Sequence, residues 1–336
     1  MKSVILVQPP FAIVDIPSVG LGTLKAILEN SGIEAKIVYG NLLLAKKISL
    51  NLYNSINQTA TASLFAEWIF STRAYPSGII NQKEYGKEFM NEKVPAPLSG
   101  KDLAVSEFFR ARETVDDYLE EISSLITKER PKIVGFSSLF QQTCASVAIA
   151  NKLKEINPEI ITVLGGSNCL KPMGEVLSDI SRSIDYVFSG EADQEFLRFC
   201  STVLKGLHPK NRFIECAPIE DLNSLPYPDY SDFFEQKKAY GIAVESNRIC
   251  FESSRGCWWG EHSHCLFCGL NGEYIKYREK TPERIKEEIN YLASEYRPDY
   301  LHTSDCIMPR KFPNTVFRNF KKPAIIKAIH YEVKPL

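Results

Sequence analysis

Three cysteines that lie close together, Cys257, Cys265 and Cys268, are the side chains of this chain best suited to metal chemistry. They follow a short apolar, strand-like run that ends at Phe251, in a segment bounded by glycines. Three thiolates can ligate three irons of a 4Fe-4S cluster and leave the fourth iron open to a bidentate ligand, whereas an electron-carrying cluster usually takes four cysteines. The missing fourth cysteine therefore points to chemistry at the cluster.

The same cysteines leave two other interpretations open. A zinc site could combine them with His262 or His264, because thiolate and imidazole also suit tetrahedral zinc. The seven residues between the first two cysteines match neither common zinc pairs nor ferredoxin runs, so spacing alone does not choose between the metals. Disulfides are disfavoured, since nine cysteines in 336 residues are an odd number and fit a reducing, cytoplasmic compartment better.

A helix is predicted after the cysteine segment, because Thr281 can act as its N-cap and Pro282 suits its first position. Apolar residues recur on one face of this helix through Leu292. The residues at 298–305 and 325–334 predict two further strands, with a short helical segment between them. The cysteine segment thus follows the first strand of a βαβαβ series, which predicts the first part of a parallel barrel with its active site at the carboxyl ends of the strands.

The cysteine segment resembles the start of a radical S-adenosylmethionine (SAM) domain. Its sequence is similar to that of the cobalamin-binding radical SAM enzymes that mature ribosomally made peptides. The residues that carry this resemblance are Ser-Arg-Gly-Cys-Trp-Trp-Gly followed by Cys-Leu-Phe-Cys-Gly-Leu-Asn-Gly. The commonest radical SAM spacing has three residues between the first two cysteines. The longer loop of this chain resembles that of the cobalamin-binding subfamily.

The resemblance implies a role for each residue of the segment. The three cysteines would ligate the cluster, and its open iron would hold the amino and carboxylate groups of SAM. Phe267 would contact the adenine, and Asp305 and Glu332, at predicted strand ends, would reach the methionine amine or the ribose hydroxyls. If they have no role in SAM binding, Asp305 and Glu332 would be solvated carboxylates that cap strands. Trp258 and Trp259 could shield the cluster or simply pack.

The residues before this segment predict a separate α/β domain at 1–205, followed by a proline-containing linker at 206–248. Apolar runs that end in polar loops alternate with helical patterns, which argues for a doubly wound, Rossmann-like parallel sheet. An insert at about 41–129 predicts helices over one face of the sheet. The predicted strands lie at 3–7, 35–39, 132–136, 160–164 and 185–188, and helices at 21–28 and 148–156.

Loops at the carboxyl edge of such a sheet face one crevice, where a ligand binds. These loops begin at Gln8, Ser137, Gly165 and Ser189, and a nucleotide, a flavin or cobalamin would each fit them. Next to a radical SAM segment, the loops resemble the cobalamin-binding domain of the same family, although paired glycines also suit a plain tight turn. The cobalamin contacts that this resemblance implies are Ser137, Ser138, Gln141, Gly165, Gly166, Ser167 and Glu191.

The pattern Asp-x-His-x-x-Gly does not occur, and none of the five histidines lies in these strand-end loops. We therefore expect no imidazole on the lower face of cobalt. By position, Leu139, Phe140 and Gln141 would be the nearest neighbours of that face.

Charge and length limit the partners. Forty basic and forty-one acidic residues give a net charge of −1, so no overall field favours nucleic acid or anionic lipid. No apolar run is long enough to cross a bilayer. By resemblance, the partners would be a precursor peptide as substrate and a reductant such as flavodoxin or ferredoxin.

The resemblance implies methylation of an unactivated carbon of the precursor peptide through a 5′-deoxyadenosyl radical and methylcobalamin. Two alternatives remain: a related radical enzyme that rearranges or oxidises its substrate, and a non-catalytic metal-binding fragment, with zinc as one option. Only 88 residues run from Ile249 to Leu336, room for three units at roughly 30 residues each. We therefore expect the second half of the barrel to be missing from this chain.

Overall fold

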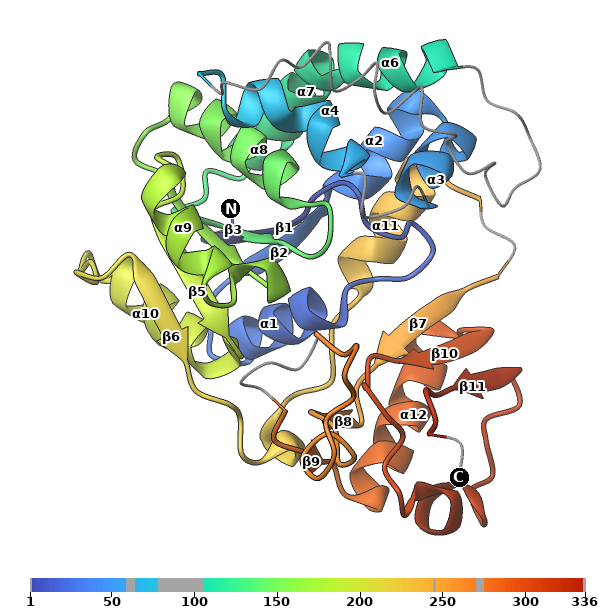
Figure 1. Ribbon diagram of the computed structural model, residues 1–336. Coiled ribbons are helices and arrows are strands. Elements are labelled where there is room, and N and C mark those ends of the chain that lie inside the picture. Colours follow the sequence, from blue (N-terminus) through green and yellow to red (C-terminus); the bar gives the residue numbers. More distant parts are fainter. Residues whose placement is uncertain (1, 59–63, 78–104, 244–245, 270–274, 335–336) are drawn as a thin grey trace. The chain divides into compact units, whose positions relative to one another are not determined.

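The computed structural model describes residues 2–58, 64–77, 105–243, 246–269 and 275–334, and it divides into two compact units (Figure 1). The first unit comprises Met1–Val14, Leu28–Ala217 and Ser231–Ile242, and the second comprises Asp15–Ile27, Pro218–Tyr230 and Ala243–Leu336. The chain therefore passes between the units several times rather than through a single linker.

A parallel six-stranded sheet forms the centre of the first unit, in the order β2-β1-β3-β4-β5-β6. This is the doubly wound sheet that the alternating sequence pattern predicts. The interior strands β1 and β3 are buried along their whole length, as expected for strands covered on both faces. The strands are β1 (Val4–Gln8), β2 (Ala35–Tyr39), β3 (Ile133–Ser137), β4 (Ile161–Gly165), β5 (Tyr186–Gly190) and β6 (Phe213–Cys216).

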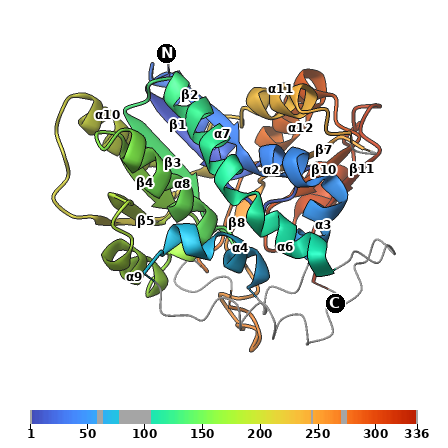
Figure 2. The ribbon, with the colours of Figure 1, turned by 90° about the horizontal axis from the view of Figure 1, so that it is seen from above.

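Helices connect these strands, and four of the connections step in the same direction across the sheet. Right-handed crossovers therefore place α8, α9 and α10 on one face, and α7 packs beside α8 there (Figure 2). Helix α1 (Val19–Asn30) contributes residues to both units. The other helices of the first unit are α2 (Gly40–Ile48), α3 (Leu50–Gln58), α4 (Phe65–Ala74), α6 (Val105–Glu113), α7 (Val115–Lys128), α8 (Thr143–Ile156), α9 (Met173–Ile180), α10 (Asp193–Leu204) and α11 (Ser231–Ala239), with a single turn at Ser167–Cys169.

The predicted linker at 206–248 differs from the structure, because it contains two elements of the first unit. Strand β6 has only four residues and is largely half-buried, so it lacks the apolar run that marks the other strands. Helix α11 closes the opposite edge of the sheet: the buried Asp232 carboxylate accepts a hydrogen bond from the Ile37 amide at 2.8 Å. Part of the predicted insert, at 59–63 and 78–104, lies outside the described residues.

The second unit holds a parallel three-stranded sheet in the order β11-β10-β7, which confirms the predicted βαβαβ order. The Thr281 hydroxyl accepts a hydrogen bond from the Arg284 amide, so Thr281 is the N-cap that the sequence predicts. The last strand is shorter than the predicted one at 325–334. The elements are β7 (Arg248–Phe251), β8 (Ser254–Arg255), β9 (Arg278–Glu279), α12 (Pro282–Tyr296), β10 (Tyr300–Thr303) and β11 (Ala328–His330), with single turns at Leu222–Ser224 and Pro313–Phe317.

Within the described ranges, no helix is both long and apolar enough to cross a bilayer.

Candidate functional site

The cysteine segment is a loop whose two ends are held together by a short antiparallel pair. Strand β8 pairs with β9, so residues 256–277 form the loop between them. Gly256 has φ +78°, and a Cβ there would lie 2.2 Å from the Lys276 carbonyl oxygen. Only glycine allows this close approach. The next residue, Cys257, donates its amide hydrogen to the Ile275 carbonyl at 3.1 Å, which fixes the first predicted ligand at the base of the loop.

The three predicted ligands are half-buried cysteines that form no disulfide. The Gly260 amide donates to the Cys257 sulfur at 3.3 Å, and the Cys268 amide donates to the Cys265 carbonyl at 3.0 Å. Backbone N–H groups aimed at cysteine sulfur are one of the means by which proteins tune iron–sulfur clusters. Three cysteine sulfurs, one of them with such a contact, therefore fit a 4Fe-4S cluster in donor chemistry.

The thiols are not gathered around one point. Among the residues that the structure describes, no three His, Cys, Asp or Glu side chains lie close enough to hold a metal ion. Phe267, between the last two cysteines, is 92% exposed. Ligation by the three cysteines and the adenine contact of Phe267 stay predictions, and residues 270–274 of the resembling motif lie outside the described residues.

Beside the cysteines, the two tryptophans form part of a cavity of about 590 Å³. The Trp258 indole nitrogen donates to the Met308 carbonyl at 3.0 Å, and the Lys334 ammonium lies 3.9 Å from the centre of the Trp259 ring. Both rings are therefore anchored by the chain itself. The full lining comprises Trp258, Trp259, His262, Tyr277, Arg278, Glu279, Arg310 and Lys311.

The two predicted SAM-binding carboxylates follow neighbouring strands but differ in environment. Asp305 is 4% exposed, and it accepts hydrogen bonds from the Ser253 amide at 2.8 Å, the Ser253 hydroxyl and the Ser254 hydroxyl at 2.8 Å. Burial raises the pKa of Asp305 to about 6, although these bonds favour the charged form. Glu332 is exposed, and its backbone carbonyl accepts from the Met308 amide. Asp305 thus ties β10 to the segment after β7, and contact with SAM stays a prediction for both residues.

The predicted cobalamin loops do gather at one edge of the first sheet, since all six strands are parallel. The loops after β3 and β4 touch directly: the Ser138 amide donates to the Gly165 carbonyl at 2.7 Å. Gly166 has φ +107°, and a Cβ there would lie 2.5 Å from the Ser138 carbonyl oxygen. Gly166 is therefore required by the contact between these loops, whatever ligand binds.

Several predicted cobalamin contacts are already hydrogen-bonded within the protein. The buried Ser138 hydroxyl lies 3.0 Å from the Thr143 hydroxyl and accepts from the Asn168 amide group at 3.1 Å. The Gln141 side-chain oxygen accepts from the Ala66 amide at 3.0 Å.

Other polar groups at this edge fit a ligand. The Ser137 hydroxyl and the Gln8 side-chain oxygen are buried without a hydrogen-bond partner in the described part of the chain. Buried polar atoms of this kind are normally satisfied by water or a ligand. Ser167 is exposed, Glu191 is half-buried, and Phe140 projects from the loop with 70% of its surface exposed. The edge therefore fits a polar, bulky ligand such as cobalamin.

A residue that the sequence did not single out, Glu67 on α4, covers the N-terminus of α8. Its carboxylate accepts hydrogen bonds from the Thr143 amide at 2.9 Å and the Cys144 amide at 2.6 Å, and burial raises its pKa. Helix N-termini of this type commonly hold ligand phosphates. Because a carboxylate of the chain itself occupies this one, the loop after β3 is poorly suited to the phosphates of a nucleotide or flavin. No local pattern around Glu67 reveals this, since it lies far from α8 in sequence.

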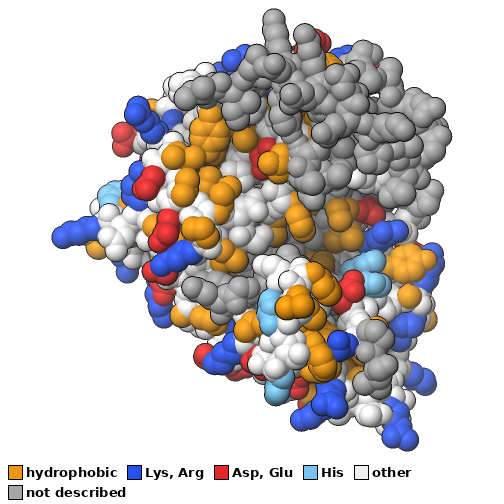
Figure 3. Space-filling model, in the orientation of Figure 1, with side chains coloured by type: hydrophobic (Ala, Val, Ile, Leu, Met, Phe, Trp, Pro, Cys, Tyr) orange, Lys and Arg blue, Asp and Glu red, His pale blue; other side chains and the backbone are white. Residues whose placement is uncertain are grey.

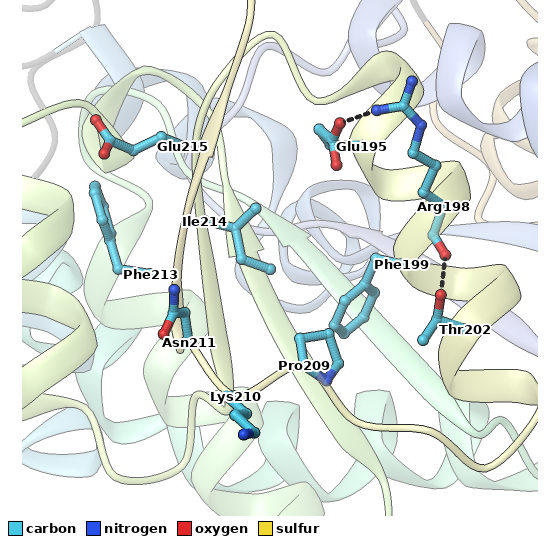
Figure 4. A pocket seen from close by; sticks show the side chains of 10 residues that line it. All are labelled: Glu195, Arg198, Phe199, Thr202, Pro209, Lys210, Asn211, Phe213, Ile214 and Glu215. Carbon is cyan, nitrogen blue, oxygen red and sulfur yellow. Dashed lines mark hydrogen bonds and ion pairs between the residues drawn. The ribbon is translucent and has the colours of Figure 1, made fainter.

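A second cavity, of about 650 Å³, lies between α10 and the β6 segment of the first unit (Figure 4). It contains none of the predicted site residues. Two of its charged side chains, Arg198 and Glu195, form an ion pair in the cavity wall. We assign no chemistry to it.

Comparison with known proteins places the chain near methyltransferases. No family model matches it. It is 25% identical over 205 residues to the anaerobic magnesium-protoporphyrin IX monomethyl ester cyclase of Rubrivivax gelatinosus, covering 55% of this chain and 35% of that protein. It is 23% identical over 270 residues to the cytidylyl-2-hydroxyethylphosphonate methyltransferase of Streptomyces wedmorensis, covering 67% of this chain and 48% of the relative.

A solved structure of the radical S-adenosylmethionine methyltransferase TsrM from Kitasatospora setae, with tryptophan substrate and a SAM analogue, also aligns. The TM-score is 0.47 and the identity 13%, over 90% of this chain and 47% of that one. The present chain thus spans less than half the length of these proteins.

Proposed function

We propose that this chain is the cofactor-binding part of a cobalamin-dependent radical SAM methyltransferase. The observation that carries the proposal is the position of the cysteine loop. It follows the first strand of a parallel βαβαβ sheet, in a chain whose other unit has ligand-ready loops at the edge of a doubly wound sheet. Sequence similarity to a methyltransferase over 67% of the chain supports the same class.

In this proposal each unit holds one kind of cofactor. Cys257, Cys265 and Cys268 would hold a 4Fe-4S cluster that binds SAM, and the β3 and β4 loops around Ser137 and Gly166 would hold cobalamin. The bound cluster with SAM supplies radical chemistry, and cobalamin supplies a transferable methyl group.

The chain's own residues would position these groups and keep water out. The Gly260 N–H stabilises negative charge on the Cys257 sulfur. The Asp305 carboxylate accepts hydrogen bonds from Ser253 and Ser254, which directly precede the cysteine loop. These bonds hold the start of the loop against the end of β10. The Trp258 and Trp259 rings, which line a cavity within the loop region, would shield the bound cluster from water.

The substrate and partners belong to the same proposal. We propose a ribosomally made precursor peptide, methylated at an unactivated carbon, as the substrate. The basis is the resemblance of the residues around the cysteines to enzymes that mature such peptides. The cluster would take its electron from a small reductant such as flavodoxin or ferredoxin. A non-methylating radical enzyme is the second candidate, and the cyclase among the relatives favours keeping it. Consumption of two SAM molecules per product separates methylation from the alternative.

Anaerobic reconstitution of the full chain with iron and sulfide tests the proposal. We expect about four irons and four sulfides per chain, and strong loss of both in Cys257→Ala, Cys265→Ala and Cys268→Ala. Cys306→Ala is the matched control, because this exposed cysteine lies in the same unit outside the loop. A colourless protein that retains one zinc and no iron would refute the proposal and leave the metal-binding fragment.

A further inference from the structure

A row of polar side chains crosses one face of the three-stranded sheet in the second unit. Ile249, Phe251 and Leu301 are fully buried on the other face. Side chains alternate along a strand, so the residues between them point the opposite way. His302 on β10 is in register with His330 on β11.

The two imidazoles lie against each other. Their ring centres are 5.2 Å apart with 30° between the planes. His302 is half-buried and His330 exposed, and Figure 3 shows histidine side chains at the surface where Figure 1 draws β10 and β11. With Arg248 and Tyr300, the two histidines line a cavity of about 340 Å³.

Arg248 contributes a positive charge to the lining of this cavity. The Asp15 carboxylate lies 3.6 Å from the Arg248 guanidinium. Burial lowers the pKa of His302, and the nearby His330 and Arg248 lower it further, while Asp15 acts in the opposite direction. A metal ion is disfavoured, because a guanidinium repels cations and the described residues contain no group of three metal ligands.

We propose that this cavity binds an oxyanion, a carboxylate or phosphate group carried by the substrate. Guanidinium and imidazolium groups donate charge-assisted hydrogen bonds to such oxygens. The assignment of this oxyanion to the substrate rests on the proposed function. The binding itself depends only on Arg248, His302 and His330, which are separate from the cysteine loop.

The test is a pH titration of the five histidines by NMR in the full chain, labelled on histidine, with no cofactor added. Spectra are compared in inorganic phosphate, in acetate, and in chloride of equal ionic strength. We expect phosphate to raise the pKa of both His302 and His330 by about 1, because a nearby opposite charge favours the protonated ring. The exposed His208 of the first unit is the internal control and should not move. A rise in acetate as well would assign carboxylates to the site, whereas a rise in phosphate alone would assign phosphate groups.

Arg248→Gln should abolish the shift of His302, whereas Lys321→Gln, which removes an exposed positive charge elsewhere in the same unit, should leave it unchanged. Equal shifts for His302, His330 and His208, or a full shift in Arg248→Gln, would overturn the inference. Because the chain carries no cluster or cobalamin in this experiment, a failed iron reconstitution and a failed oxyanion titration are separate results.

Discussion

Single residues in this protein combine unusual burial with specific hydrogen bonds, and Asp305 is the clearest case. Its carboxyl is 4% exposed and has a pKa of about 6, raised from the ordinary 3.8 by burial. An acid whose pKa is raised on folding stabilises the protein when protonated, and this contribution is lost as pH rises through the folded-state pKa. Stability from Asp305 is therefore fully present below pH 3.8 and lost by about pH 6.

Replacing Asp305 by asparagine should remove this pH dependence, because the amide does not titrate. Between pH 4 and pH 7, the free energy of unfolding of the native chain should fall relative to Asp305→Asn by about 3 kcal/mol. Urea unfolding of both chains under reducing conditions measures this difference. Parallel pH curves for the two chains would contradict the assignment of the raised pKa to Asp305.

For single residues, the sequence predicts the position of a side chain along an element better than its contacts. The position of Asp305 at a strand end was predictable, because the strand expected at 298–305 ends in this polar residue. Its hydrogen bonds to Ser253 and Ser254 were not predictable, since they join residues about fifty positions apart. The pairing of His302 with His330 depends in the same way on strand register, which a single sequence does not specify.

At the scale of elements, helix α4 of the insert caps a helix of the first unit. The Glu67 carboxylate of α4 binds the N-terminus of α8. It accepts from both the Thr143 and Cys144 amides, which have no partner within the helix. The carboxylate also carries the charge that helix N-termini favour.

Glu67→Gln should therefore destabilise the chain by about 1 kcal/mol, because the amide offers one acceptor oxygen to two N–H donors. Glu159→Gln, at an exposed glutamate beyond the C-terminus of α8, is the matched control and should change stability little. Chemical denaturation at neutral pH measures both variants. Equal stability of Glu67→Gln and the native chain would argue against this capping role.

Most strands and the helix after the cysteine loop were predictable, because each is a short apolar run or a capped amphipathic pattern. Strand β6 was not, since its four residues are mostly half-buried and mixed in polarity. The roles of α4 and α11 were also hidden, because each packs on an element that lies far away in the sequence.

As a whole, the molecule combines two units whose sequence segments are interleaved. The stretches 15–27 and 218–230, which the sequence assigns to the first domain and the linker, pack with the second unit. Such exchange leaves no compositional boundary, so the sequence could not predict it. The nearly balanced charge of −1 is consistent with a protein whose recognition depends on local sites rather than on an overall field.

The central claim is that three cysteines leave one iron of a cluster open for SAM. Electron paramagnetic resonance of the reduced, reconstituted chain tests it directly. The account predicts a 4Fe-4S signal that changes when SAM is added. A cluster signal indifferent to saturating SAM, or the absence of any 4Fe-4S signal, would contradict it.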